Sequence, residues 1–208
     1  MKKILTAITV TLIFFISGCK KEETANPWHI KIQDGTEVYN FSGLTYNPLT
    51  SDGTTASFSS FASLGSSGSS NFYNTQSHFL VRLGNISSVG FDVVFTTADS
   101  AITAALKISN SNTIRFNAFK QVVKTGVYSF NNAKITPFII YVDKNGMSWS
   151  TDFSQTNSLE IISVSPNTQD NTANALITQI NFDIALKDIN NTLTKRIKGS
   201  TFNFFNLD

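Results

Sequence analysis

Apolar and polar side chains alternate from Leu176 to Lys187 in a pattern that leaves little choice of secondary structure. The even positions are apolar apart from one threonine, whereas most of the odd positions carry an amide or a charge. Because successive side chains of a strand point to opposite faces, this period of two predicts a strand that is buried on one face only. The stretch therefore predicts an antiparallel sheet.

The chain after this strand can return beside it as the second half of a hairpin. A turn at Asn190-Asn191 would place Ile197 opposite Ile184 on the buried face. The same register would place Lys198 opposite Asp183 on the exposed face, where opposite charges favour the pairing.

A second hairpin is predicted at Asn145-Gly146, because this dipeptide is the strongest signal for a two-residue turn. Such a turn would pair Val142 with Trp149 and place both side chains in the core. The opposite, polar face of the hairpin would then carry Tyr141, Asp143, Ser148 and Ser150.

Further short strands are predicted along the rest of the chain, between clusters of turn residues. They are expected at Trp28–Val38 with a turn at Asp34-Gly35, and at Phe41–Tyr46, His78–Leu83, Phe91–Thr96, Thr113–Phe119, Val127–Phe130, Ile135–Val142 and Thr201–Leu207. Two segments allow alternatives. The Ser/Gly/Thr-rich segment 48–76 predicts either a flexible surface loop or a pair of weak strands. Residues 98–107 predict a helix capped by Thr97, although Ile102–Ile108 could equally form a strand.

Many short strands with at most one short helix indicate an all-β fold. We expect one domain, residues 28–208, folded as an antiparallel β-sandwich, with a barrel-like arrangement as the alternative. Eighteen phenylalanines against 14% charged residues indicate that this domain has a substantial core.

The first residues of the chain carry the signals of export. Two lysines precede an apolar run of 13 residues, 4–16, which is shorter than the roughly 20 residues that span a bilayer. The run ends at Ile16-Ser17-Gly18-Cys19, which resembles the lipobox of bacterial lipoproteins. The resemblance implies a signal peptide at 1–18, cleavage between Gly18 and Cys19, and lipid acylation of the cysteine.

Cleavage and acylation would change the chemistry of the mature chain. Loss of Lys2 and Lys3 leaves 16 − 2 = 14 basic residues against 14 acidic ones, so no nucleic-acid partner is expected. Cys19 is the only cysteine, so its acylation excludes disulfides, thiol catalysis and cysteine metal sites. Residues 19–27 would form a tether of at most ~30 Å. Because no later segment is long and apolar enough to span, the acylated cysteine is expected to be the sole membrane contact.

The residues after the cysteine bear on location. Lys20 stands where an aspartate would favour retention in the inner membrane. Lys20-Lys21-Glu22-Glu23 also resembles the charged export signals of surface lipoproteins in the Bacteroidota. The resemblance implies an outer-membrane anchor, with the domain facing the cell exterior rather than the periplasm.

The C-terminal strands carry a second resemblance. Segments 179–188 and 197–204, together with Trp149-Ser150-Thr151, are similar to the closing hairpin of small Bacteroidota lipoproteins of unknown function. That family implies a β-sandwich and no known activity. The chain departs from its pattern in the long Ser/Gly segment and in lacking a glycine before Asn181-Phe182.

Few residues have the spacing that catalysis or metal binding requires. His29 and His78 have no carboxylate or second histidine at ligand spacing, so neither a metal nor a cofactor is expected. Glycan hydrolysis would need two carboxylates held ~5–10 Å apart. The candidates are Asp143, Asp152 and Glu160, for which a solvated position on the surface is the simpler interpretation.

Two surface features remain as candidate sites. Tyr141, with Asp143, Ser148 and Ser150 beside it, is the best candidate for an aromatic platform that binds a ligand. Asp99-Ser100-Ala101 matches the tripeptide that similar Bacteroidota proteins use for O-glycosylation, which would fall on Ser100.

These observations predict a lipid-anchored, non-enzymatic module that binds a glycan or a protein partner. The first alternative is a structural accessory subunit of an envelope complex, which would expose an apolar patch or an unpaired edge strand. The second alternative is a carboxylate-based glycan hydrolase.

Overall fold

A computed structural model describes residues 29–42, 55–67, 70–83, 87–108, 110–132, 134–166 and 174–207. The predicted signal peptide, the tether and Trp28 lie outside the described residues, as do residues 43–46 of the predicted strand at Phe41–Tyr46.

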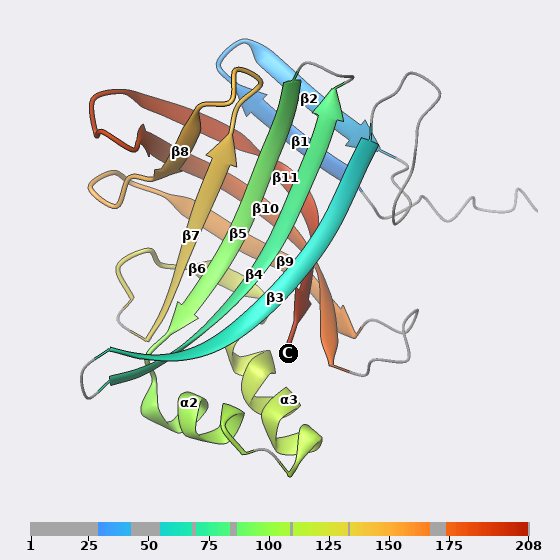
Figure 1. Cartoon of the computed structure of the whole chain (residues 1–208), viewed down its shortest axis with the longest axis vertical. Helices are drawn as coiled ribbons and strands as arrows, with labels where there is room; N and C mark the ends of the chain where they lie inside the picture. Colours follow the sequence, from blue (N-terminus) through green and yellow to red (C-terminus); the bar gives the residue numbers. More distant parts are fainter. Residues whose placement is uncertain are drawn as a thin grey trace, which may run out of the picture.

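The described residues form eleven strands in one antiparallel sheet, ordered β2-β1-β11-β10-β8-β7-β5-β4-β3, with β9 pairing β10 and β6. Figure 1 shows how this sheet curls, so that the half with β3, β4, β5 and β7 faces the half with β1, β9, β10 and β11. The strands are β1 His29–Asp34, β2 Glu37–Ser42, β3 Thr55–Ser67, β4 Ser70–Leu83, β5 Ser87–Thr97, β6 Gly126–Tyr128, β7 Ile135–Val142, β8 Ser148–Thr151, β9 Ser158–Pro166, β10 Ala175–Asp188 and β11 Thr194–Asn206.

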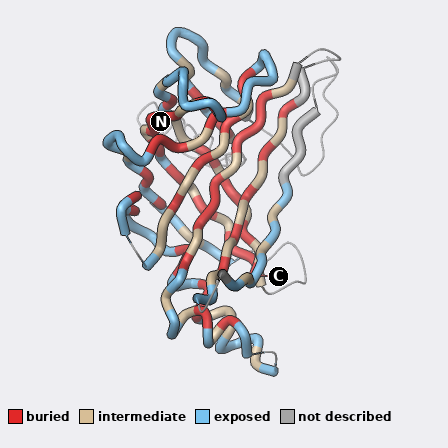
Figure 2. Tube along the Cα trace, turned by 60° about the vertical axis from the view of Figure 1, so that its left-hand side comes forward, coloured by how far each residue is buried: buried red, intermediate tan, exposed pale blue. Residues whose placement is uncertain are grey.

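The all-β prediction is confirmed, and the curled sheet is closer to the barrel-like alternative than to two separate layers. The core lies between the two halves, where buried residues alternate along the strands (Figure 2). Phe91 of β5 meets Phe182 of β10 across this interior, with ring centroids 4.7 Å apart. Burying such rings supplies much of the stability of a fold without disulfides.

Two short helices, α2 Ser100–Leu106 and α3 Asn112–Val122, lie at one end of the curled sheet (Figure 1). The predicted helix at 98–107 is confirmed, but its cap is Asp99, which accepts hydrogen bonds from the N–H groups of Ala101 and Ile102. α3 packs against the sheet through Phe119, whose ring lies edge-on to Tyr73.

The predicted strand at Thr113–Phe119 is wrong, because these residues belong to α3. Apolar residues at 114, 116 and 118 imitate a period of two. The residues that α3 buries are Ala118, Phe119 and Val122, which have the spacing of a helix face. The part of the chain that the structure describes therefore contains two short helices, where at most one was expected.

The Ser/Gly/Thr-rich segment forms strands where it is described. β3 and β4 pair without interruption from Thr55↔Arg82 to Ser67↔Ser70. The pair-of-strands alternative is therefore confirmed for residues 55–67 and 70–76, and the flexible-loop alternative is wrong there. Inward-facing Thr75 and Ser77 are buried, so small polar side chains fill this part of the interior.

The hairpin of β10 and β11 has the predicted register, with Ile184 opposite Ile197 and Asp183 opposite Lys198. The even-numbered residues from 176 to 186 are all buried, as the alternation predicted. Asp188 organises the turn by accepting hydrogen bonds from the N–H groups of Thr192 and Leu193.

The register of the β7–β8 hairpin differs from the prediction by one residue. Tyr141, not Val142, is opposite Trp149. Asp143 pairs with Met147, so the loop holds three residues, 144–146, and Gly146 closes it with φ +78°. Because a one-residue shift moves every side chain to the other face, Tyr141 and Asp143 point inward. Trp149 is in the core as predicted, but the residue paired with it is Tyr141 and not Val142.

Candidate ligand pocket at the turn end of the barrel

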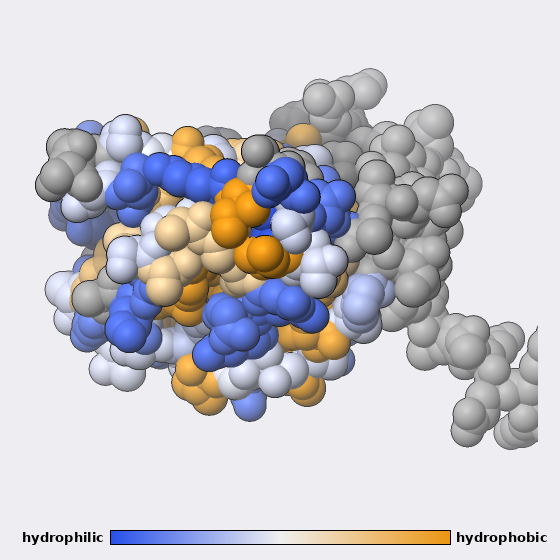
Figure 3. Space-filling model, turned by 90° about the horizontal axis from the view of Figure 1, so that it is seen from below, coloured by the Kyte–Doolittle hydropathy of each residue, from blue (hydrophilic) through white to orange (hydrophobic). Residues whose placement is uncertain are grey.

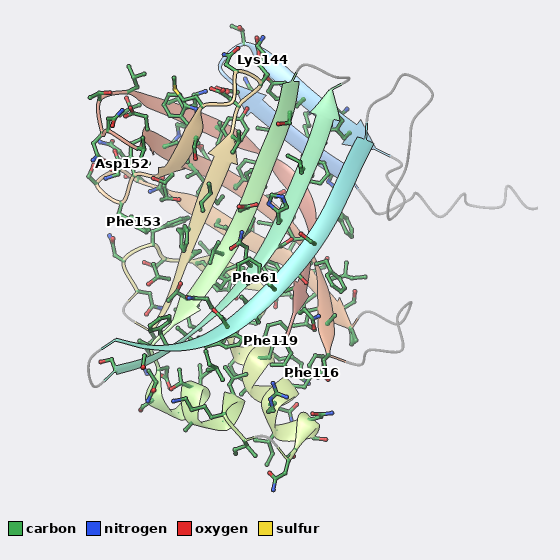
Figure 4. The ribbon with its side chains drawn as sticks, in the orientation of Figure 1. Phe61, Phe116, Phe119, Lys144, Asp152 and Phe153 are labelled. Atoms are coloured by element: carbon green, nitrogen blue, oxygen red, sulfur yellow. The ribbon has the colours of Figure 1, made fainter. Side chains whose placement is uncertain are left out.

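A polar pocket lies at the end of the sheet that carries the β1–β2 and β7–β8 turns. Lys144, at the tip of the second turn, marks this end in Figure 4, opposite the helices. The pocket has a volume of about 310 Å³. It is lined by Asp34, Gly35, Thr36, Glu37, Tyr39, Asp143, Lys144, Asn145 and Lys195.

The backbone of the two turns shapes the rim of the pocket. Gly35 (φ +61°) and Gly146 (φ +78°) adopt the left-handed conformation that lets each chain reverse tightly. The Asp143 carboxylate fixes its turn by accepting hydrogen bonds from the N–H groups of Asn145 and Met147, at 3.0 and 3.1 Å. The same carboxylate is thus both a turn-forming group and part of the pocket wall.

Lys195, near the start of β11, occupies the centre of a half-buried charge cluster. Its Nζ lies 2.9 Å from Asp34 Oδ2 and 3.2 Å from Asp143 Oδ2. It also lies 4.1 Å from the centroid of the Trp149 ring, a favourable position for a cation. The Trp149 indole N–H donates to Asp143 Oδ2 at 2.9 Å, so this aromatic ring holds both the cation and the anion.

Two tyrosines extend the network toward the pocket mouth. The buried Tyr141 hydroxyl donates to Asp34 Oδ2 at 3.1 Å, and burial raises the pKa of this phenol, which keeps it a donor. The Tyr39 hydroxyl donates to Glu37 at 2.5 Å, and Glu37 also forms an ion pair with Lys144. The acidic groups, the two lysines and the Tyr39 phenol of the wall are therefore each oriented by a neighbour.

Two carboxylates of the pocket, those of Glu37 and Asp143, have lowered pKa values. The Lys144 ammonium and the Tyr39 hydroxyl lower the pKa of Glu37. Burial acts to raise the pKa of Asp143, but hydrogen bonds from Trp149 and Lys195 outweigh it, and the pKa lies below its usual value. A general acid at neutral pH needs a raised pKa, so neither group is tuned for protonating a leaving group.

The predicted aromatic platform does not form. Tyr141 has no exposed surface and Asp143 is only 5% exposed, because both point into the core. Ser148 and Ser150 lie opposite Val142 and Ile140 on the outer face. The four residues are therefore divided between the two faces of the sheet, and only Asp143 lines the pocket.

The two histidines lie apart, on different strands. His78 forms an ion pair with Asp92 on the outer face of β4 and β5, and this hydrogen bond raises the pKa of the imidazole. His29 Nε2 is 3.3 Å from Ser200 Oγ. In the described part of the chain, no three histidine or acidic side chains are grouped as a metal site would require.

The other candidate residues have local roles or exposed positions. Asp152 accepts hydrogen bonds from the backbone N–H and hydroxyl of Ser154, which explains its burial. Glu160 is exposed on β9, opposite Asn181. Ser100 is exposed at the first position of α2.

Sequence reasoning missed Asp34, Glu37, Tyr39 and Lys195 as site residues. One signal was present in the predicted β10–β11 register, which also places Lys195 opposite Leu186 on the buried face. A lysine on a buried face needs an acidic partner, so this position pointed to a buried ion pair. The acidic partners themselves come from distant parts of the chain.

Comparisons with known proteins do not identify the chain: no family model, no curated protein and no solved structure matches it. Within the described residues, none of the helices has the length and apolar character needed to cross a membrane.

Proposed function

We propose that the protein is a lipid-anchored lipoprotein of the outer membrane whose β domain binds a glycan in the pocket at its turn end. The proposal has two parts, attachment and recognition, which depend on different residues and are tested separately.

The observation that supports recognition is the density of fixed hydrogen-bonding groups around the pocket. Its volume falls at the lower end of small-molecule sites, which are usually lined by apolar groups. Here the wall consists of carboxylates, ammonium groups, an amide and a phenol, as described above. A ligand that matches such a wall carries many hydroxyl groups, and a saccharide has this chemistry. The ring of Tyr39 supplies an apolar surface among the polar groups.

The charges of the pocket support binding without hydrolysis. Every carboxylate in the pocket has a cationic partner: Lys195 for Asp34 and Asp143, and Lys144 for Glu37. A glycosidase needs one carboxyl group that is protonated at neutral pH. The ionised pairs of this pocket are therefore suited to orienting a ligand, and they favour a binding module over a hydrolase.

Substitutions on the rim should weaken glycan binding without unfolding the domain. Asn145→Ala and Tyr39→Phe each remove one exposed hydrogen-bonding group, which we expect to raise the Kd by about 5- to 20-fold. Titrations followed by NMR, with cellotetraose, mannotetraose and N-acetyllactosamine as the trial ligands, measure this change. Glu160→Gln is the matched control, because Glu160 is exposed on β9 and is absent from the pocket lining. A saccharide that binds all three variants equally, or shifts that map away from the pocket, would contradict the site.

Acylation should depend on Cys19 alone. In cells fed an alkyne analogue of palmitate, Cys19→Ala should abolish labelling of the protein, whereas Ser100→Ala should leave it unchanged. The readout is the label and not membrane fractionation, because an uncleaved leader could itself hold the variant at the membrane. Labelling of the Cys19→Ala chain would rule out the proposed anchor. Protease treatment of intact cells then addresses location, since a surface domain is digested and a periplasmic one is protected.

The accessory-subunit alternative has one observation in its favour. β3 is an edge of the sheet and pairs only with β4 among the described strands, and its 13 residues include no charged side chain. An edge of this kind can accept a strand from another protein. This alternative would be favoured by two results together. The parent protein would bind none of the trial saccharides, and Asn145→Ala and Tyr39→Phe would still capture a protein that pairs with β3.

A further inference from the structure

The segment Ser100–Thr125, which comprises α2, α3 and the residues around them, has an unusual charge. It carries four basic residues and no acidic one, although the chain after residue 18 has 14 of each. The four are Lys107, Arg115, Lys120 and Lys124. We call this segment the helical end. A concentration of one sign on a balanced chain points to a partner of the opposite sign.

Three of these basic residues, Lys107, Lys120 and Lys124, form no salt bridge with an acidic side chain that the structure describes. Lys107 Nζ is 2.6 Å from the side-chain oxygen of Asn71, a neutral group. Lys120 lies 5.3 Å from the centre of the Phe116 ring. The nearby Asp99 is 3.7 Å from Lys134, a lysine outside the segment. Lys107, Lys120 and Lys124 are exposed, so their charges are available to a partner.

Apolar side chains accompany these charges. Ile108, in the α2–α3 connection, is 36% exposed, and Ile114, in the first turn of α3, is 45% exposed. Phe116 is partly buried, with Lys120 beside it. Figure 3 views the molecule from this end and shows apolar groups surrounded by hydrophilic ones. Basic side chains around exposed isoleucines form a surface that suits the boundary between lipid headgroups and acyl chains.

We propose that the helical end rests on the surface of an anionic lipid bilayer. The inference depends on the proposed anchor, which would keep the domain near its membrane. Anionic headgroups would pair with Lys107, Lys120 and Lys124, while Ile108 and Ile114 enter the headgroup layer. Each lysine near such a surface strengthens the contact by about fivefold. The lipid anchor would then not be the sole membrane contact, and the domain would hold one orientation.

The geometry of the chain permits this contact. A tether of residues 19–27 reaches at most ~30 Å when extended, and it joins a domain whose first described strand begins at His29. The helices and the polar pocket lie at opposite ends of the curled sheet (Figure 4). With its helical end on the bilayer, the domain would direct the pocket away from the membrane, toward a ligand in solution.

A fluorophore placed on the helical end tests the contact in the acylated protein. Because Cys19 is the only cysteine and is acylated in the mature chain, Ile114→Cys supplies a single reactive thiol. We expect a polarity-sensitive dye at this position to shift to the blue on vesicles with 30% phosphatidylglycerol, and to be quenched there by brominated lipid. Neither effect is expected on phosphatidylcholine vesicles, and about 0.5 M salt should reverse both. A dye at Met147→Cys, on the β7–β8 turn at the opposite end, should not respond.

Charge variants give the second readout. In Lys107→Gln/Lys120→Gln/Lys124→Gln, loss of three charges should reduce the ratio of docked to undocked domains by about a hundredfold. The matched control, Lys31→Gln/Lys187→Gln/Lys198→Gln, removes three positive charges from the sheet. In this variant the dye at Ile114→Cys should still shift to the blue on the anionic vesicles. Circular dichroism checks that both variants are folded.

The outcomes separate this inference from the proposed anchor. A protein that floats with both kinds of vesicle, while its Ile114→Cys dye is insensitive to lipid charge, would overturn the contact and leave the anchor standing. A protein that floats with neither would contradict both, because neither acyl chains nor helical end would hold it.

Discussion

Lys195→Met should lower the free energy of unfolding by about 3 kcal/mol, because it leaves two carboxylates together without their cation. Asp34 and Asp143 both contact the Lys195 ammonium, and their side chains are only 15% and 8% exposed. The methionine would also lose the contact of the ammonium with the Trp149 ring. Urea unfolding measures the change as a lower midpoint at an unchanged slope.

Lys198→Met, on the same strand, is the control for this variant. Lys198 pairs with Asp183, but its side chain is 59% exposed, and an exposed pair contributes at most about 1 kcal/mol. Adding Asp34→Asn and Asp143→Asn to Lys195→Met should restore part of the lost stability, because both unpaired charges are removed. The recovery is partial because an asparagine at position 143 has one acceptor oxygen, whereas the carboxylate accepts from the turn N–H groups through one oxygen and from Trp149 through the other. Equal effects of Lys195→Met and Lys198→Met would show that the cluster does not stabilise the fold.

The same cluster predicts how the variant responds to acid. The pKa of Asp143 is lower in the folded chain than in the unfolded chain, where it is about 3.9. Its contribution to stability is therefore present above pH ~4 and is lost as the pH falls through the folded-state pKa. Without the Lys195 ammonium the folded-state pKa rises, so Lys195→Met should begin to lose this contribution at a higher pH than the parent.

Gly199→Ala should destabilise the domain by about 3 kcal/mol or more, because β1 passes too close to β11 for a side chain at this position. A Cβ atom on Gly199 would lie 1.8 Å from the carbonyl oxygen of Lys31 and 2.8 Å from the Phe182 ring. The ring could turn aside, but the carbonyl belongs to the β1–β11 ladder, in which Lys31 pairs with Ser200. The strands must therefore separate and lose hydrogen bonds.

Gly90→Ala is the matched control, because Gly90 also lies within a central strand. Its Cβ would meet the Val142 Cβ at 3.3 Å, a contact that a shift of a few tenths of an ångström between the strands relieves. The alanine also restricts the unfolded chain, a gain of about 0.4–1 kcal/mol, so the net change should be within about 1 kcal/mol. Thermal unfolding of the two variants compares them. If Gly199→Ala costs no more than Gly90→Ala, β1 and β11 do not approach as closely as described.

Local patterns predicted most of the strands because each pattern repeats within one element. The β10–β11 hairpin was predicted residue by residue, since alternation over 176–187 and the polar turn both specify the same register. β7 was predicted at its observed bounds, Ile135–Val142. These features depend on contacts between neighbours in sequence, which a pattern can encode.

The register of the β7–β8 turn could not be predicted from local patterns. Asn-Gly is compatible with a two-residue turn and with a three-residue loop closed by glycine. The choice is made by Asp143, whose carboxylate binds the turn N–H groups, and by Lys195, which holds that carboxylate inward. Since Lys195 is 52 residues away, no local pattern around Asn145 contains this information.

The sequence alone therefore determined an all-β domain, the buried face of β10 and, through Cys19, the predicted attachment to a membrane. Tertiary structure decided where the pocket lies and what lines it. Asp34 and Lys195 are 161 residues apart, and Tyr141 is 107 residues from Asp34. The pairing of β1 with β11 places Asp34 beside Lys195, and the curling of the sheet brings Tyr141 of β7 to them. An ion pair between such distant residues forms because burial of the surrounding core holds the strands in place, and core burial is a property of the whole fold.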